Sequence, residues 1–325
     1  MFIGCDFLKK RIGIIAIIVA VCLFIAAGIC FFIYKSEMDK YEQDEKAVQA
    51  IADKIIDDEP VPTISNDTYK KSYVNADAVS NDVSDNVSDN VSDDMQYDND
   101  GAQYYSDDDG DYLYDPDYYL KRHIDFDYLQ SINKDATRWL TIPGTNVDYY
   151  VMQEPVVGES YYLWRNIYGN SSSWGSLLSP AIPGGGDSAH TLIFGHHMID
   201  GSVAFSSFSN YYYSDAYNAN AYRDVYVYYP DHSERWKVWA ACDGYSSDRV
   251  YNIPSDLGSN SYVDLIQSMK SKARYKLGSA PDSNTKTLVM STCNGWYAGS
   301  NVRFYVVCKP DVGYNYTDKK VFTIK

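Results

Sequence analysis

Cysteine is sparse in this chain of 325 residues: six are scattered along it, and no two of them form a CxxC pair. Structural zinc sites and dense disulfide frameworks need closely spaced cysteines, so this spacing argues against both. A basic stripe is also lacking, and nucleic-acid binding therefore has little support. We expect no metal, no other cofactor and no nucleic-acid partner.

Lysine, arginine and glutamate are absent from residues 72–117, where 14 aspartates lie. The whole chain has 44 acidic and 28 basic residues, a net charge of −16, and leaving this stretch out gives 30 acidic against 28 basic residues, or −2. The acidity is therefore local. It does not predict a cationic partner for the remainder of the chain.

Charge is also absent from residues 12–34, a run of 23 mostly apolar residues. A helix of that length crosses about 30 Å of hydrocarbon. Residues 9–11 are Lys-Lys-Arg, and under the positive-inside rule they keep the N-terminus, residues 1–11, in the cytoplasm and the C-terminal bulk outside the cell. A cleaved signal peptide is the alternative, with residues 26–28 (Ala-Ala-Gly) as a small-residue cleavage site, but the apolar run continues to Tyr34, beyond the ~7–15 residues usual for such a peptide. We therefore predict an uncleaved, single-pass anchor in the cell membrane.

Two segments are predicted between the anchor and the folded domain. Residues 35–58 are expected to form a stalk helix, because Tyr41, Val48 and Ile55 recur at seven-residue intervals. Residues 59–117 are expected to be a disordered, Asp-rich linker, since low hydrophobicity and dense like charge cannot offset the entropy of ordering. Such a linker would serve as a solvated spacer that lifts the next domain off the membrane.

The linker contains two runs of aspartate before glycine, residues 98–101 and 107–110, which raise the alternative of a calcium loop. The EF-hand pattern needs a ligand residue two positions before each run, and the residues found there are Gln96 and Tyr105. We therefore favour the spacer over a calcium site.

Short segments with the character of β-strands, separated by turn residues, dominate residues 118–325. A helical segment comes first, at residues 117–133, and a second helix is predicted at residues 261–276, where Ser261 and Asp264 resemble a capping box. Many short strands with turns between them predict a barrel or a sandwich, and the segment is long enough for one good core. The expected strands are residues 139–145, 147–153, 191–194, 224–229, 235–242, 286–292 and 302–308.

Three cysteines lie C-terminal to the apolar run: Cys242, Cys293 and Cys308. Cys242 ends an apolar segment and Cys308 alternates with apolar residues on one strand face, so both are predicted to lie in the core, with a disulfide between them left open. Cys293 differs, because it stands where a strand gives way to a loop that begins with Asn294. This exposed place suits a nucleophile, whose thiolate needs a nearby base or cation to form near neutral pH.

A histidine and an arginine occupy comparable places at strand edges. His196 follows a predicted strand directly after Gly195, while His197 points the opposite way in an extended chain, so only one of the two can readily face Cys293. Arg303 opens the last predicted strand. It is either an edge-strand charge in solvent or a permanent cation beside the thiolate and the developing oxyanion.

Three motifs follow one another along the chain: TLIFGHHM at residues 191–198, MSTC at residues 290–293 and NVRFYVV at residues 301–307. Together they resemble the sortases of Gram-positive bacteria, which are membrane-anchored cysteine transpeptidases. The segment WLTIPGTNVDYYVMQ at residues 139–153 is similar to class B sortases in particular, as is the second predicted helix between late strands. The resemblance covers residues 118–325 and implies a mainly β fold, a sortase-type closed β-barrel with N-terminal helices and one helix inserted between late strands.

The resemblance also implies a role for each candidate residue. Cys293 would be the nucleophile, His196 the acid/base, and Arg303 the residue that stabilises the oxyanion or orients the substrate. The residues implied in substrate binding are Ser291, Thr292, His197 and, through its backbone, Asn294. Such a site would cleave a C-terminal sorting motif of secreted proteins through a thioacyl-enzyme, and would transfer the acyl group to an amine of a peptidoglycan precursor or to a pilin lysine.

The sequence departs from the class B pattern at a few places: Tyr150, Phe194, Met290 and residues 175–179, which lack an aspartate. None of these removes a catalytic group, but they leave substrate preference open. Two other functions also stay open. One is a cysteine peptidase that releases its thioacyl intermediate to water, and the other is a catalytically silent surface scaffold, against which the intact set of cysteine, histidine and arginine argues.

Overall fold

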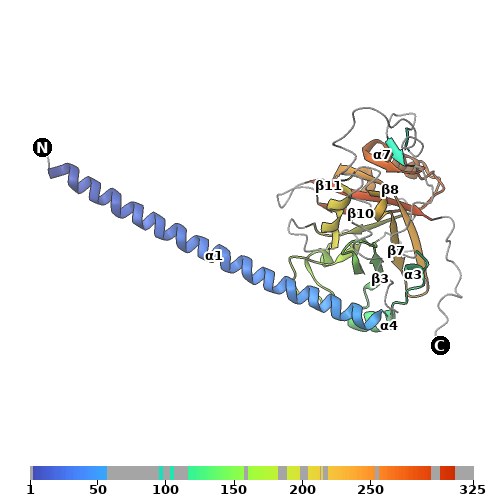
Figure 1. Ribbon diagram of the computed structural model, residues 1–325, viewed down its shortest axis with the longest axis horizontal. Coiled ribbons are helices and arrows are strands. Elements are labelled where there is room, and N and C mark those ends of the chain that lie inside the picture. Colours follow the sequence, from blue (N-terminus) through green and yellow to red (C-terminus); the bar gives the residue numbers. More distant parts are fainter. Residues whose placement is uncertain are drawn as a thin grey trace, which may run out of the picture. The chain divides into compact units, whose positions relative to one another are not determined.

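The computed structural model describes residues 3–56, 95–97, 103–105, 116–156, 160–181, 189–197, 204–212, 214, 219–252, 256–293 and 301–311. The chain divides into two compact units, Met1–Ala50 and Ile51–Lys325. In its described part the first unit consists of helix α1 up to Ala50, and the second consists of the last residues of α1 and a β-barrel with short helices (Figure 1).

Helix α1 runs without interruption from Ile3 to Ile55. The predicted anchor at 12–34 and the predicted stalk at 35–58 are therefore parts of one helix, which ends at Ile55 rather than at residue 58. Among the described residues, α1 is the helix long and apolar enough to cross a membrane, and large apolar side chains such as Phe24 are exposed on it. A signal anchor and a signal sequence both have such a helix, so its retention and its orientation remain predictions.

Two short helices precede the barrel, α3 (Pro116–Lys121) and α4 (Phe126–Ile132), within the segment of residues 117–133 that was predicted to be helical. Asp125 separates them, because it starts α4. Its carboxylate accepts a hydrogen bond from the main-chain N–H of Tyr128 at 2.9 Å, which caps α4.

The end of α1 is bonded to the residues just before α4. Ile56 and Ile124 form an isolated β-bridge, and the main-chain N–H of Asp125 donates to the carbonyl of Ile55 at 2.9 Å. The residues that flank the predicted linker, 59–117, are therefore held side by side. The role of this segment as a spacer stays a prediction, since residues 57–94, 98–102 and 106–115 lie outside the described residues.

Eight of the described strands close a mixed β-barrel, which confirms a barrel over a sandwich (Figure 1). Their order around the ring is β8-β11-β10-β6-β5-β4-β3-β7, and β7 pairs with β8 to complete it. Closure depends on the 13 residues of β8, which pair with β7 through their first part and with β11 over most of their length. The strands are β3 (Ala136–Thr141), β4 (Asp148–Gln153), β5 (Leu177–Ser179), β6 (His190–Phe194), β7 (Asp224–Tyr228), β8 (Ser233–Tyr245), β10 (Thr287–Cys293) and β11 (Val302–Pro310).

Three further strands extend the sheet beyond β8: β9 (Ala273–Leu277), β2 (Gln103–Tyr105) and β1 (Met95–Tyr97). β2 pairs in parallel with β9, and β1 and β2 form an antiparallel hairpin. The prediction of a linker without secondary structure over 59–117 is therefore wrong at these two strands and at the first residues of α3. The two candidate calcium runs lie outside the described residues.

Helix α7 (Asn260–Lys272) lies in the chain between β8 and β9, which confirms the helix predicted between late strands. It was expected to reach residue 276 but ends earlier, because the next residues form β9 and bury the last three side chains of that strand. Its N-cap is Ser259, whose hydroxyl accepts from the N–H of Tyr262 at 3.3 Å, rather than a capping box at Ser261.

Buried side chains form one cluster inside the barrel and a second cluster between the barrel wall and α7. Successive side chains of β11 point alternately into the two clusters: Val306 belongs to the inner cluster and Tyr305 to the outer one. Cys308 lies in the inner cluster and Cys242 in the outer cluster, both fully buried and free. Their predicted core positions are confirmed, the disulfide between them does not form, and burial raises the pKa of both thiols.

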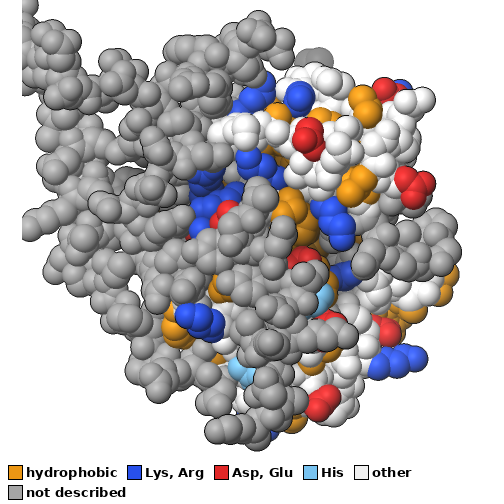
Figure 2. Space-filling model, turned by 90° about the vertical axis from the view of Figure 1, so that its right-hand side faces the viewer, with side chains coloured by type: hydrophobic (Ala, Val, Ile, Leu, Met, Phe, Trp, Pro, Cys, Tyr) orange, Lys and Arg blue, Asp and Glu red, His pale blue; other side chains and the backbone are white. Residues whose placement is uncertain are grey.

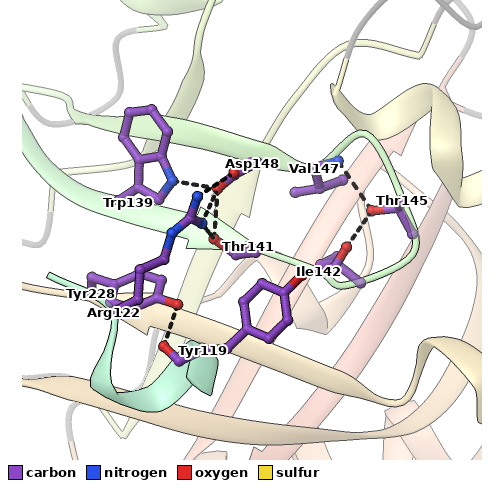
Figure 3. Close-up of polar contacts among 9 residues, drawn as sticks. All are labelled: Tyr119, Arg122, Trp139, Thr141, Ile142, Thr145, Val147, Asp148 and Tyr228. Carbon is purple, nitrogen blue, oxygen red and sulfur yellow. Dashed lines mark hydrogen bonds and ion pairs between the residues drawn. The ribbon is translucent and has the colours of Figure 1, made fainter. Parts of the chain in front are cut away.

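A polar cluster fastens the segment after α3 to the hairpin of β3 and β4, and we call it the Arg122–Asp148 clamp (Figure 3). Arg122, with 8% of its side chain exposed, donates from both terminal nitrogens to the two carboxylate oxygens of Asp148, at 2.8 and 2.9 Å. The same carboxylate accepts from the indole of Trp139 at 2.6 Å and from the hydroxyl of Thr141 at 2.7 Å. Tyr228 of β7 adds a hydrogen bond of 2.5 Å to a main-chain carbonyl of α3.

Charged side chains of both signs share the surface. On the described part of the face in Figure 2, Lys and Arg side chains lie among Asp and Glu side chains. Two surface ion pairs, Arg249 with Asp264 at 3.0 Å and Lys272 with Asp248 at 2.9 Å, illustrate the mixture. It agrees with the near-neutral balance of the chain outside its Asp-rich stretch.

His190 opens β6 in a fully buried position, between the hydroxyl of Thr287 and the carbonyl of Val250, each 2.8 Å from a ring nitrogen. Burial lowers the pKa of His190 from 6.5 to about 4, so the ring is neutral in the folded protein. The unfolded chain takes up a proton below pH 6.5, whereas the folded chain does so only near pH 4. The free energy of unfolding should therefore fall as the pH falls through this window, by up to about 3 kcal/mol.

Urea unfolding of the full chain in detergent, at about pH 7 and about pH 4.5, measures this effect. His190→Gln should reduce the pH dependence, because its side chain does not titrate. His123→Gln, at an exposed position before α4, is the matched control and should keep the wild-type dependence. Equal pH dependence in His190→Gln and wild type would show that His190 is not the linked group.

Candidate active site

Three adjacent strands carry the predicted catalytic positions. β10 and β11 pair with Cys293 opposite Arg303. β6 runs parallel to β10, and their last ladder pair is Phe194 with Ser291, so two residues further along each strand His196 comes level with Cys293. A main-chain bond of 3.2 Å, from the residue before His196 to the carbonyl of Ser291, shows that β6 still follows β10 beyond that pair. The structure therefore brings backbone positions 196, 293 and 303 together at one level of the barrel.

His196 is held by a segment more than thirty residues earlier in the chain. Its Nε2 lies 2.7 Å from the carbonyl oxygen of Leu163, and since a carbonyl only accepts, Nε2 carries the hydrogen of this bond. The ring also lies against the indole of Trp164, with 4.9 Å between the ring centroids. Burial lowers the pKa of His196, and the bond to the carbonyl opposes that shift without reversing it. The imidazole is therefore neutral near neutral pH, as a general base must be before it accepts a proton.

Leu163 and Trp164 belong to a short 3-10 helix, η1 (Tyr161–Trp164), which the sequence reasoning missed. The buried carboxylate of Glu154 accepts a hydrogen bond from the N–H of Tyr162 at 2.8 Å and so fixes the start of this turn. A single 3-10 turn is too short to show a periodic pattern. Its aromatic residues were the one available signal, and they would have suited a strand equally well.

Arg303 stands near the start of β11, where its guanidinium donates to the carbonyl of Val302 at 2.9 Å. β11 pairs with β10 on one side and with β8 on the other, so the interpretation of Arg303 as an edge-strand charge is wrong. By alternation it shares a face of β11 with Tyr305 and Val307, which belong to the outer cluster. A half-buried cation therefore lies in register with position 293.

The residues predicted to bind substrate lie in different environments. Ser291 is fully buried, and its hydroxyl is 2.8 Å from the hydroxyl of Tyr251. Thr292 is also buried, and within the described part of the chain no hydrogen-bond partner reaches its Oγ1. His197 is half-buried, which lowers its pKa, and Asn294 lies outside the described residues. The substrate-binding role of all four stays a prediction.

Comparison with known proteins shows which of them this chain resembles. No family model matches the chain. Sortase B of Listeria monocytogenes serovar 1/2a is 26% identical over 171 residues, which are 51% of this chain and 65% of that protein. The match thus spans less than two thirds of the curated relative.

Solved structures of sortase B are similar in fold. A cysteine-to-serine mutant form of Clostridium perfringens sortase B matches with a TM-score of 0.50 and 22% identity, over 57% of this chain and 86% of that one. The Staphylococcus aureus sortase B–substrate complex gives a TM-score of 0.49 and 20% identity, over 57% of this chain and 84% of that one. From the Listeria sequence and the Clostridium fold, the chain is a sortase B-like protein with a closed, eight-stranded mixed barrel and a long N-terminal apolar helix.

Proposed function

We propose that the chain is a class B-like sortase, a cysteine transpeptidase that works through a thioacyl-enzyme. One observation supports this most strongly: the strand register puts positions 196, 293 and 303 at one level of a sortase B-like barrel. A thiol, an imidazole and a guanidinium at these positions supply a nucleophile, an acid/base and a fixed cation. In this proposal residues 118–325 form the catalytic domain.

In the first half-reaction Cys293 attacks the carbonyl carbon at the scissile bond of a sorting motif. The main-chain N–H of Asn294 and the guanidinium of Arg303 stabilise the negative oxygen of the tetrahedral intermediate. His196 takes the thiol proton and gives it to the leaving nitrogen, so the C–N bond breaks with the release of a neutral amine. The acyl group then remains on sulfur as a thioester.

In the second half-reaction an amine attacks the thioester. Its nitrogen loses a proton to His196, a new amide bond forms, and the C–S bond breaks as His196 passes that proton to the sulfur, which restores the thiol and the neutral imidazole. Ser291, Thr292 and His197 contribute to the substrate groove in this proposal. The acceptor is an amine of a peptidoglycan precursor or a pilin lysine, and the donors are secreted proteins with a C-terminal sorting motif.

Membrane attachment suits these substrates. We assign residues 12–34 of α1 as a retained single-pass anchor with residues 1–11 in the cytoplasm, which puts the barrel outside the cell. The neutral state of His196 leaves it ready to accept the thiol proton. A thiolate–imidazolium pair that forms in this way titrates as a unit, so the pH dependence of the reaction belongs to the pair rather than to either residue.

A peptide-library assay with mass spectrometry tests the proposal. The full chain in detergent is incubated with a library of candidate sorting-motif peptides, with and without an added amine acceptor. We expect acyl–acceptor products that appear only when the acceptor is present. Hydrolysed peptide alone, with acceptor present, would make the chain a cysteine peptidase, and no turnover of any peptide would favour the silent scaffold.

A further inference from the structure

The main-chain carbonyl of Leu163 lies against two groups at once. One is Nε2 of His196, at 2.7 Å. The other is Gly175, where a β-carbon would collide with the oxygen of Leu163 and lie 2.6 Å from its carbonyl carbon. Since real β-carbons do not come that close to backbone atoms, any side chain at position 175 would push the peptide group of Leu163 aside.

The approach of Gly175 is built into the backbone on both sides of it. Its φ is +59°, a conformation that glycine adopts at little cost and other residues rarely adopt. The next residue, Ser176, donates from its N–H to the carbonyl of Tyr162 at 2.9 Å and from its hydroxyl to the carbonyl of Arg165 at 2.8 Å. These two bonds attach Ser176 to one residue before Leu163 and to one residue after it. The carbonyl of Leu163, which accepts the hydrogen bond from His196, therefore has little freedom to move.

We propose that this backbone contact sets the tautomer of His196 and that Gly175 is a positioning residue for it, which rests on the acid/base role of His196 proposed above. The carbonyl of Leu163 can only accept, so Nε2 must hold a hydrogen. In the neutral ring Nδ1 is then unprotonated. Nδ1 is therefore the atom that takes the proton from the sulfur of Cys293 and passes it to the leaving nitrogen as the C–N bond breaks.

Trp164 supports the same arrangement. Its indole packs on the imidazole at 4.9 Å and follows directly after Leu163 in η1, so one short turn supplies both the acceptor for Nε2 and the surface against which the ring rests. Rotation of the imidazole ring by half a turn would break the hydrogen bond from Nε2 to Leu163 and would place the unprotonated Nδ1 against the carbonyl oxygen of Leu163, where no hydrogen bond can form. A shift of the Leu163 carbonyl should therefore change the orientation of the His196 ring, although Gly175 itself is not proposed to contact the substrate.

Two glycine variants of the full chain in detergent separate positioning from backbone strain. Gly175→Ala introduces both strain and the collision with Leu163. Gly258→Ala is the matched control, because Gly258 has a φ of +74° but its added β-carbon would meet nothing nearer than the side-chain oxygen of Asn284 at 3.5 Å. We expect kcat to fall by about 10²-fold in Gly175→Ala with KM changed by less than about 3-fold, and both values to stay near wild type in Gly258→Ala. Equal kcat in the two variants would overturn the proposal.

A spectroscopic measurement tests the tautomer without substrate. Long-range ¹⁵N–¹H spectra of the wild-type chain with ¹⁵N-histidine, with the signal assigned by its loss in His196→Asn, should show Nε2 protonated and Nδ1 unprotonated near neutral pH. A protonated Nδ1 in the wild type would overturn the proposal even if Gly175→Ala did not fold. Failure of the wild type to transfer acyl groups would instead contradict the proposed function and leave the tautomer result standing.

Discussion

Replacement of Cys293 by alanine is expected to lower acyl transfer by about 10⁴-fold or more, because loss of the nucleophile in a covalent mechanism leaves only binding and oxyanion stabilisation. The wild-type chain, quenched in acid during turnover of a sorting-motif peptide, should carry the mass of the acyl fragment. Cys293→Ala should carry none, while peptide binding persists. The measurement is denaturing mass spectrometry together with the rate of product formation.

Cys242→Ala provides the matched control for that experiment. Cys242 is fully buried in the outer cluster, and burial raises the pKa of its thiol, so it is a poor nucleophile. The variant should keep both the acyl adduct and the transfer rate, apart from a modest loss of stability. An adduct of equal size in wild type and Cys293→Ala would show that another residue carries the acyl group and would refute the proposed mechanism.

Removal of Asp148 from the Arg122–Asp148 clamp is expected to destabilise the fold by about 3 kcal/mol, because it takes the charged partner from a buried guanidinium. The side chain of Arg122 is 8% exposed, whereas that of Asp148 is 38% exposed, so we place the loss at the lower end of the range for buried pairs. Asp148→Ala also leaves the buried indole N–H of Trp139 without its acceptor. Urea unfolding of the full chain measures the change.

Asp264→Ala is the matched control for the clamp. Asp264 accepts from Arg249 at 3.0 Å, a comparable distance, but both side chains are about 60% exposed. Exposed pairs contribute about 0–1 kcal/mol, so this variant should unfold almost as the wild type does. A loss for Asp148→Ala no larger than that for Asp264→Ala would mean that the clamp does not stabilise the fold.

Local patterns in the sequence predicted much of the barrel. The strands that become β3, β4, β6, β7, β8, β10 and β11 carry alternating or continuous apolar residues between clear turns, and they form close to the expected residues. β5 was missed because it has three residues, too few for a pattern. β9 was assigned to the preceding helix, because the apolar residues of 273–277 continue a helical spacing as well as a strand spacing, and only pairing with β8 decides between them.

In the candidate site, too, features that depend on local sequence could be predicted, whereas features that depend on long-range contacts could not. The motifs around His196, Cys293 and Arg303 are local, and the sequence predicted all three positions at strand ends, while their roles stay predictions. The contacts of Leu163 with His196 and of Tyr251 with Ser291 join residues 33 and 40 positions apart. No local pattern near Leu163 or Tyr251 predicts these contacts, because both form only when the barrel has closed. Strand order likewise could not be foreseen, and so Arg303 could not be recognised as lying inside the sheet.

The bond between the end of α1 and the start of α4 has a consequence for how the Asp-rich segment can change. Ile56 pairs with Ile124, and Met95 pairs with Tyr105, so the chain between Ile56 and Met95 is attached to the fold at both ends, and a change in its length alters the free energy of unfolding mainly through the entropy of closing a loop. Each doubling of such a loop costs only about 0.6 kcal/mol. Residues 81–92 lie in this interval and consist of three four-residue repeats, Asn-Asp-Val-Ser followed by two copies of Asp-Asn-Val-Ser. Copies of this repeat can therefore be gained or lost with little effect on the stability of the barrel.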